Sequence, residues 1–313
     1  MSVSPFPPPS FPLSLSAVTA RLRAAGCVFA EDEAELLTST ARTAADLAAM
    51  VDRRVAGLPL EHVLGWAEFC GLRVTIDPGV FVPRRRSEFL AAQAIDLARR
   101  TLTDGSGGPP AGRPVVVVDL CCGSGALGAA VAAALSAPAE PAPNEPVPTE
   151  PVPAEFAPGA EERVARAPVE VHGVDIDPVA VRCARRNLAP AGGHVHQGDL
   201  YEPLPDRLRG RVGVLLASPP YVPSGAIGLL PAEAREHEPL LALDGGADGL
   251  DIVRRVIAGA PLWLAPGGHL LVETSERQAT NTAEAMSRAG LTPRVTSSDE
   301  LYATVVIGTM ARG

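Results

Sequence analysis

Residues 115–125 read Val-Val-Val-Val-Asp-Leu-Cys-Cys-Gly-Ser-Gly, and this stretch decides the fold class. Four successive β-branched residues followed by Asp119 predict a strand that is buried on both faces, as in a parallel sheet. Gly123 and Gly125 let the backbone approach a ligand closely, and the helix predicted to follow offers free backbone N–H groups. The stretch therefore predicts a strand, a ligand-binding turn and a helix.

The alternation of strand and helix continues toward the C-terminus. Apolar segments predict further strands at 169–174, 194–197, 212–217, 268–273, 292–297 and 302–307, and helices near 178–188, 249–264 and 276–289. Alternation of this kind predicts a doubly wound α/β sheet. In such sheets ligands bind outside the carboxyl ends of the strands, where Asp119, Asp175, Asp199 and Ser218 are all expected.

Composition narrows the class of protein. The chain has 313 residues, a hydrophobic content of 46% and a formal net charge of −9. The charge argues against tight sequence-independent nucleic-acid binding and favours a protein or small-molecule acceptor. No window approaches the ~18 uninterrupted apolar residues of a membrane span, and the N-terminus lacks a signal-peptide pattern, so we expect a cytoplasmic protein without membrane contact. Five cysteines without metal-ligand spacing predict reduced thiols and no metal.

The chain divides into segments of different composition. The Pro/Ser-rich residues 1–13 are predicted to be disordered, and apolar residues at helical spacing over 14–58 predict a small helical bundle. Residues 59–85 form a strand-rich connector with turns at Cys70-Gly71 and at 77–79. The main domain is expected over 86–313, with Ser87 as the N-cap of its first helix and a flexible Pro/Ala/Glu-rich insertion over 137–168.

Polar residues at the ends of successive strands suggest a nucleoside site. Asp175 can accept hydrogen bonds from both ribose hydroxyls, Asp199 can accept the adenine amino group, and Leu200 can cover the ring. A dinucleotide site is the nearest rival, but Gly-x-Gly-x-x-Gly is complete only if Gly128 is counted. Gly128 is expected inside the helix, where packing explains it. The six histidines show no evident cluster and are read as structural.

Ser218-Pro219-Pro220-Tyr221 follows the apolar strand at 212–217 and suggests methylation of a planar nitrogen. The lone pair of such a nitrogen is delocalised, so a catalyst must hold the NH2 group with two hydrogen-bond acceptors. Ser218 Oγ and a carbonyl of Pro219 or Pro220 can do this, because proline carries no competing N–H. Tyr221 can pack its ring on the acceptor.

Together these motifs resemble a known family. The glycine-rich turn, Asp175 and the Asp199 motif are similar to the S-adenosylmethionine site of class I methyltransferases, and Ser-Pro-Pro-Tyr resembles their Asn-Pro-Pro-Tyr motif. Residues 59–65, 68–72, 82–88 and 238–251 resemble the connector and a Leu-Asp-Gly-Gly segment of the PrmC/HemK family, the protein-(glutamine-N(5)) methyltransferases acting on peptide chain release factors. The resemblance runs from about Leu15 to Gly308.

The resemblance implies a class I methyltransferase fold over 86–313, a β-hairpin connector over 59–85 and a substrate-docking bundle over 14–58. It implies an enzyme that uses S-adenosyl-L-methionine to methylate the glutamine of a Gly-Gly-Gln loop in a release factor. We expect a monomer, although the sequence does not decide the oligomeric state. The implied catalytic residues are Ser218, Pro219, Pro220 and Tyr221, and the same four with Arg84 bind the substrate. The implied cofactor-binding residues are Asp119, Cys121, Cys122, Gly123, Ser124, Gly125, Asp175, Asp199, Leu200 and Ser218.

The chain departs from the family pattern at several positions. Ser218 replaces the family's asparagine, Cys121-Cys122 replaces Gly-Thr, and the helical bundle is shorter than usual. Ser-Pro-Pro-Tyr also resembles the motif of cytosine-N(4) and adenine-N(6) DNA methyltransferases, so a nucleic-acid amino-methyltransferase is the rival enzyme. A domain that binds S-adenosylmethionine or a translation partner without turnover is the non-enzymatic alternative, suggested by Ser218.

Overall fold

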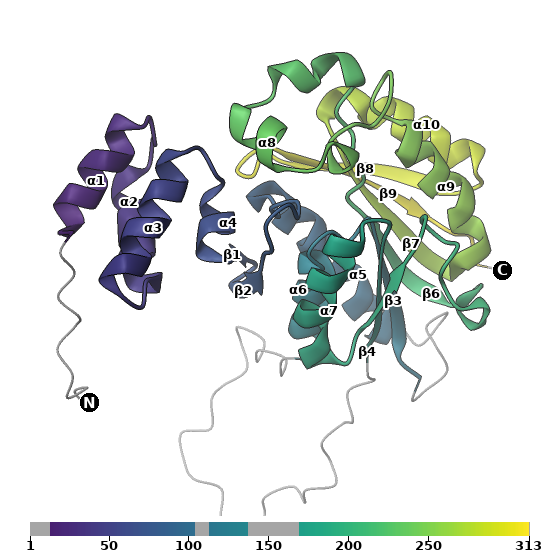
Figure 1. Cartoon of the computed structure of the whole chain (residues 1–313). Helices are drawn as coiled ribbons and strands as arrows, with labels where there is room; N and C mark the ends of the chain where they lie inside the picture. The colour runs from purple at the N-terminus through teal and green to yellow at the C-terminus, as the bar shows by residue number, and fades with distance from the viewer. Residues whose placement is uncertain (1–12, 104–112, 137–168, 313) are drawn as a thin grey trace, which may run out of the picture.

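The computed structural model describes residues 13–103, 113–136 and 169–312 (Figure 1). The insertion predicted over 137–168 and all but the last residue of the N-terminal segment predicted to be disordered lie outside the described residues. Within these ranges, no helix has both the length and the apolar character needed to cross a membrane.

The main domain is built on a seven-stranded sheet whose order is β5-β4-β3-β6-β7-β9-β8. Neighbouring strands are parallel except that β9 runs antiparallel to both β7 and β8. The predicted class I methyltransferase fold is thereby confirmed. The strands are β3 (Val115–Leu120), β4 (Val169–Asp175), β5 (His194–Gln197), β6 (Val212–Ala217), β7 (Leu264–Thr274), β8 (Thr292–Ser298) and β9 (Ala303–Thr309).

Helices cover both faces of the sheet (Figure 1). One face packs against α5 (Glu88–Thr103), α6 (Ala126–Ser136) and α7 (Pro178–Leu188), and the other against α9 (Asp251–Trp263) and α10 (Ala279–Arg288). Side chains of β3 alternate between the two cores: Val115 and Val117 face the first, and Val116 and Val118 face the second. Burial of both faces is why the strand consists of consecutive apolar residues.

At the start of one helix the structure follows the local capping signal, and at the start of another it does not. Asp177 caps α7 by accepting a hydrogen bond from the Val179 N–H at 2.8 Å, and Pro178 occupies the first turn, as the sequence favours. The predicted N-cap Ser87 is wrong. A 3-10 turn, η1 (Arg85–Ser87), precedes α5, so Ser87 already lies inside the helical segment and is buried.

The N-terminal residues form a separate apolar cluster joined to the sheet domain by a hairpin. Helices α1 (Leu15–Ala24), α2 (Ala30–Thr40) and α3 (Ala44–Val55) pack together with α4 (Leu60–Leu64). The hairpin strands β1 (Trp66–Phe69) and β2 (Leu72–Thr75) follow. Cys70 and Gly71 both have positive φ, of 50° and 71°, which matches a tight two-residue hairpin turn. The bundle contacts the segment after β6 through Arg54, whose Nη1 lies 3.3 Å from Glu233 Oε1 in α8 (Ala232–His237).

Three histidines gather on β4 and β5, so the expectation that the histidines form no cluster was wrong. The ring of His172 stacks on those of His194 and His196 at centroid distances of 5.0 and 5.2 Å. His172 Nδ1 lies 2.9 Å from His196 Nε2, and its Nε2 lies 2.9 Å from Glu170 Oε1. The register pairs His172 with His194, a contact between positions that are far apart in the sequence.

The cluster predicts acid sensitivity of the fold. Burial and the neighbouring His172 lower the pKa of His196 to about 4, so between about pH 4 and 6.5 the unfolded chain binds more protons than the folded protein. The free energy of unfolding should therefore decrease as the pH falls through this window. We expect the urea midpoint to drop from pH 7 to pH 5, and to drop less in His196→Gln. Equal decreases in both proteins would contradict a role for His196.

Candidate functional site

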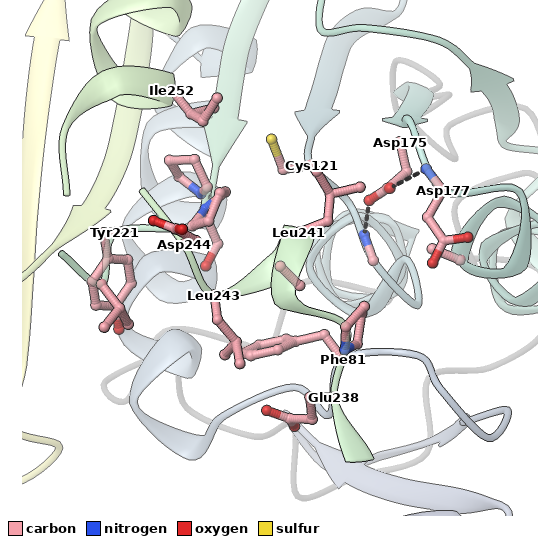
Figure 2. Close-up of a pocket in the computed structure, with 18 of the residues that line it drawn as sticks. Phe81, Cys121, Asp175, Asp177, Tyr221, Glu238, Leu241, Leu243, Asp244 and Ile252 are labelled. Atoms are coloured by element: carbon pink, nitrogen blue, oxygen red, sulfur yellow. Dashed lines mark hydrogen bonds between the residues drawn. The ribbon is translucent and has the colours of Figure 1, made fainter. Parts of the chain in front are cut away.

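A cavity of about 570 Å³ opens at the carboxyl ends of β3, β4 and β6. Figure 2 shows Asp175 on one side of it and Tyr221 on the other, with Phe81 and Glu238 along a third edge. Its volume is within the range of small-molecule and cofactor sites. Strand ends, the connector and the segment around α8 all contribute lining residues. The carboxyl edge of the parallel strands is therefore the candidate site.

The glycine-rich turn after β3 forms one wall. Cys121 and Gly123 line the cavity, and both have a φ of 55°. The Cys122 N–H donates to the Val174 carbonyl at 3.0 Å, and the Gly123 N–H donates to Asp175 Oδ2 at 2.8 Å. A methyl group built on Gly123 would meet no atom within 4 Å, so the turn leaves open space beside the carboxylate. Burial raises the pKa of the Cys121 and Cys122 thiols, which keeps them neutral.

Four of the predicted cofactor residues support this turn and do not line the cavity. Asp119 is fully buried, and its Oδ2 accepts the Gly128 N–H at 3.0 Å, which ties β3 to α6. Burial raises the pKa of Asp119 to about 7. The Ser124 carbonyl accepts a hydrogen bond from Asn187 Nδ2 at 2.8 Å. Cys122 and Gly125 pack toward β4 and α7. The spacing of residues in the sequence could not distinguish the residues packed beneath the turn from those that line the cavity.

Asp175 lies at the end of β4 and faces the cavity. Its Oδ1 accepts the Asp177 N–H at 2.9 Å, and its Oδ2 accepts the Gly123 N–H, which orients the carboxylate (Figure 2). Each oxygen keeps further acceptor capacity. Burial raises the pKa of Asp175, and the two backbone N–H groups work in the opposite direction. Asp175 is thus a hydrogen-bond acceptor with a fixed orientation at the cavity wall.

Asp199 and Leu200 line the cavity beyond β5, at the carboxyl edge of the sheet. Leu200 is buried and has a φ of 49°. Asp199 Oδ2 accepts a hydrogen bond from Arg255 Nη2 at 2.7 Å, a partner on α9 that the sequence did not indicate. Arg255 neutralises part of the charge and sets the direction of the carboxylate. Because a carboxylate has about four acceptor sites, Asp199 can still accept an amino group.

The Ser-Pro-Pro-Tyr segment follows β6 and lines the opposite wall. Among the described residues, none donates a hydrogen bond to the carbonyl of Pro219 or Pro220. The Tyr221 carbonyl, in contrast, accepts a hydrogen bond from Gln278 Nε2 at 3.0 Å. Burial, followed by the charge of Glu273, raises the pKa of Tyr221 to about 12, so its hydroxyl is protonated at neutral pH. The segment combines a fixed backbone with unused acceptors.

A loop rich in glycine supports this segment from behind. The Val222 N–H donates to the Leu243 carbonyl at 3.1 Å, and the Gly245 N–H donates to the Val222 carbonyl at 2.9 Å. Gln278 Nε2 also donates to the Asp248 carbonyl at 3.0 Å, which joins the loop to η6 (Glu276–Gln278). Residues 238–251 therefore hold the acceptor motif in place, which gives a physical reason for that part of the resemblance.

Sequence reasoning missed two buried carboxylates: one lines the cavity, and the other lies behind the cavity wall. Glu273, at the end of β7, has a side chain that is only 4% exposed and lies close to Ser218, Tyr221 and Arg86. The sequence did indicate Glu273, because an acid after an apolar strand is the same pattern that identified Asp175. Glu238 forms an ion pair with Arg84 and accepts the Val82 N–H at 3.2 Å. Burial raises the pKa of Glu238, and Arg84 counteracts the increase.

Arg84, for which the resemblance implies substrate binding, lines the cavity but is already paired. Its guanidinium lies against Glu238 and over the Phe81 ring, 4.7 Å from the ring centroid. The pair ties the connector to the segment before η5 (Leu240–Ala242). The cavity thus brings together Arg84, Cys121, Gly123, Asp175, Asp199, Leu200, Ser218, Pro219, Pro220 and Tyr221. Within the part of the chain that the structure describes, no group of three or more His, Cys, Asp or Glu side chains is arranged to hold a metal ion.

Comparison with known proteins identifies relatives along most of the chain. The chain is 33% identical over 252 residues to a release factor glutamine methyltransferase of Geobacter sulfurreducens, covering 80% of this chain and 72% of that protein. It is 30% identical over 306 residues to the release factor glutamine methyltransferase of Mycolicibacterium smegmatis, covering 92% of each chain. A 4-amino-L-phenylalanine/4-methylamino-L-phenylalanine methyltransferase of Streptomyces pristinaespiralis is 32% identical, covering 73% of this chain and 65% of that enzyme.

Solved structures add a distant likeness. A methyltransferase from Pyrococcus furiosus superimposes with a TM-score of 0.47 at 14% identity, covering 83% of this chain and 99% of that one. No protein-family model matches the chain.

Proposed function

Since the chain belongs to the release factor glutamine methyltransferase family, we propose that it methylates the side-chain amide nitrogen of a glutamine in a peptide chain release factor, with S-adenosyl-L-methionine as methyl donor. The target is the glutamine of a Gly-Gly-Gln loop, as the sequence resemblance implies. One observation carries the proposal: the nucleoside-type wall with Asp175 and the acceptor wall with Ser218 and Tyr221 face one cavity.

The cavity fits S-adenosylmethionine by its shape and its chemistry. Open space at Gly123 lies beside the oriented carboxylate of Asp175, which would bind the ribose hydroxyls. Asp199 would accept the adenine amino group, and Leu200 and Ile252 would cover the base. The cofactor supplies an electrophilic methyl group on a sulfonium.

The chain's own residues align the acceptor nitrogen. Ser218 Oγ and the unused carbonyl of Pro219 hold the two N–H bonds of the amide, and the Tyr221 ring packs on its plane. Held in this way, the nitrogen would form its bond to the methyl group as the bond from sulfur to that methyl breaks, and the sulfur would leave as a neutral thioether. The reaction gains mainly from this alignment, and the proton leaves to solvent after transfer without a strong general base.

Labelling tests the proposal directly. Purified release factors, factors with Gln→Ala in the Gly-Gly-Gln loop, and bare DNA and RNA should each be incubated with methyl-labelled S-adenosylmethionine. We expect label in the unmodified factors alone, with mass spectrometry locating it on the glutamine. Label confined to nucleic acid would replace the proposal by a nucleic-acid amino-methyltransferase. Bound cofactor without label in any acceptor would also overturn it.

An arylamine acceptor is the second candidate. The Streptomyces pristinaespiralis relative is named for methylating 4-amino-L-phenylalanine. In this chain Ser218 is shorter than asparagine, and Phe81, Leu241 and Leu243 give the cavity apolar walls that suit an aromatic ring. Including 4-amino-L-phenylalanine in the same labelling assay separates the two candidates.

A further inference from the structure

We infer that Glu273 is a positioning residue whose carboxylate accepts a hydrogen bond from the Ser218 hydroxyl. With its proton engaged in this way, Ser218 can act toward the substrate only as a hydrogen-bond acceptor. Ser218 Oγ lies 3.5 Å from Glu273 Oε2. Hydrogen bonds of catalytic groups are commonly long without substrate and shorten in the complex. The inference rests on the proposed glutamine methylation and explains how serine replaces asparagine there.

The sheet brings these two residues together. The register of β6 and β7 pairs Ala217 with Val272, so Ser218, directly after the end of β6, and Glu273, near the end of β7, each follow that pair by one residue. The side chain of Glu273 is only 4% exposed, and a buried carboxylate requires partners. The contact is therefore built into the pairing of the strands, although 55 residues separate the two positions.

The chemistry of serine makes this partner necessary. An asparagine Oδ1 can only accept hydrogen bonds, whereas a serine hydroxyl both donates and accepts. A hydroxyl free to donate would form a hydrogen bond with the carbonyl of the substrate amide and turn the amide away from its productive orientation. When the proton is held by Glu273 Oε2, both lone pairs of Ser218 Oγ remain for the substrate N–H.

The other oxygen of Glu273 is already engaged. Tyr221 Oη donates to Oε1 at 3.3 Å, and Arg86 Nε lies 3.3 Å from the same atom. Both groups are hydrogen-bond donors, so in Glu273→Gln they orient the glutamine side chain with its amide oxygen toward them. The amide NH2 then faces Ser218 and donates to Oγ. This variant thus reverses the direction of the Ser218 hydrogen bond with little change in shape.

A double-mutant cycle with Ser218→Asn tests the inference, with methyl transfer to a release factor as readout. Glu273→Gln should lower kcat about tenfold in the wild-type background and less than about threefold in the Ser218→Asn background, because asparagine Oδ1 carries no proton that must be kept away from the substrate. Glu273→Gln should leave the KM for S-adenosylmethionine unchanged in either background. Equal losses in both backgrounds, no loss in the wild-type background, or an inactive Ser218→Asn enzyme would overturn the inference.

Glu238→Gln is the matched control. It also removes the charge of a buried, arginine-paired carboxylate at the cavity, but Glu238 bonds to Arg84 and not to Ser218. Its effect on kcat should be the same in both backgrounds. A background-dependent effect of Glu238→Gln would mean that the cycle reports general loosening of the site, which would overturn the inference.

Failure of the proposed function can be distinguished from failure of this inference. If the wild-type protein does not label a release factor, the proposed function is wrong, and the inference is then tested by urea unfolding of Ser218→Ala, Glu273→Ala and the double variant, because alanine at either position removes the hydrogen bond. The effects on the unfolding equilibrium constant should then be non-additive by a factor of about 3 to 10 if the hydrogen bond exists. Additive effects would overturn it.

Discussion

Asp175→Ala should weaken the binding of S-adenosylmethionine by about a hundredfold or more. Hydrogen bonds to a charged group contribute about 1.5–3 kcal/mol each, and the variant removes the carboxylate proposed to accept both ribose hydroxyls. It also frees the Gly123 and Asp177 N–H groups, which Asp175 orients now. Isothermal titration calorimetry with S-adenosylmethionine measures the loss, after thermal unfolding has shown that the variant is folded.

Asp177→Ser is the matched control for this prediction. Asp177 also lines the cavity, but its Oδ1 caps α7 by accepting the Val179 N–H at 2.8 Å. Serine is an equally good N-cap, so the helix start is kept while a neighbouring carboxylate is lost. Affinity should change by less than about fivefold. The assignment of Asp175 fails if its variant binds as well as wild type or if both variants lose affinity equally.

Gly249→Ala should reduce methyl transfer at least about a hundredfold while leaving S-adenosylmethionine affinity within about threefold, because a small displacement of a reacting group costs this much. Gly249 has a φ of +77°, which is strained for alanine. A Cβ there would also lie 3.0 Å from the Tyr221 carbonyl carbon and 2.5 Å from Gln278 Nε2. The backbone that carries the acceptor motif must therefore shift. Transfer rates and calorimetry on the same preparation test both parts.

Gly228→Ala provides the comparison. Gly228 lies in η4 (Ser224–Leu229), in the same stretch after β6, and a Cβ built on it meets no atom within 4 Å. Its transfer rate should remain within about twofold of wild type. A similar loss in both variants would show that the whole segment tolerates no change, and an active Gly249→Ala would show that the loop behind the acceptor motif does not position Tyr221.

The fold was predictable because its signals are local and repeated. The run Val115–Leu120 is apolar at nearly every position because β3 is buried on both faces, and that pattern depends on neighbours in the sequence alone. Helix α7 begins and ends at the predicted residues because Asp177 and Pro178 determine its first turn locally. Ser87 was misplaced as the cap because the helical path begins earlier: the Ser87 N–H donates to the Arg84 carbonyl at 2.8 Å, which makes Ser87 part of the 3-10 turn η1.

The site was predictable only in part, for a related reason. Asp175, Asp199, Leu200 and Ser218 line one cavity because the carboxyl ends of parallel strands meet at one edge, whatever the details of packing. The ion pairs made by charged residues of the cavity were not predicted. Arg255 with Asp199 and Glu238 with Arg84 join positions that are 56 and 154 residues apart, and no periodicity links such positions.

The sequence by itself determined the doubly wound sheet, the polar residues that follow its strands, and the motif that suits methylation of an amide, because each depends on residues adjacent in the chain. The tertiary structure alone decided which of those residues reach the cavity and which lie beneath it. Asp119 binds the Gly128 N–H in the core, whereas Glu273 comes beside Ser218. The physical reason is that strand register and helix packing set the distances between side chains remote in sequence, and hydrogen-bond chemistry depends on those distances.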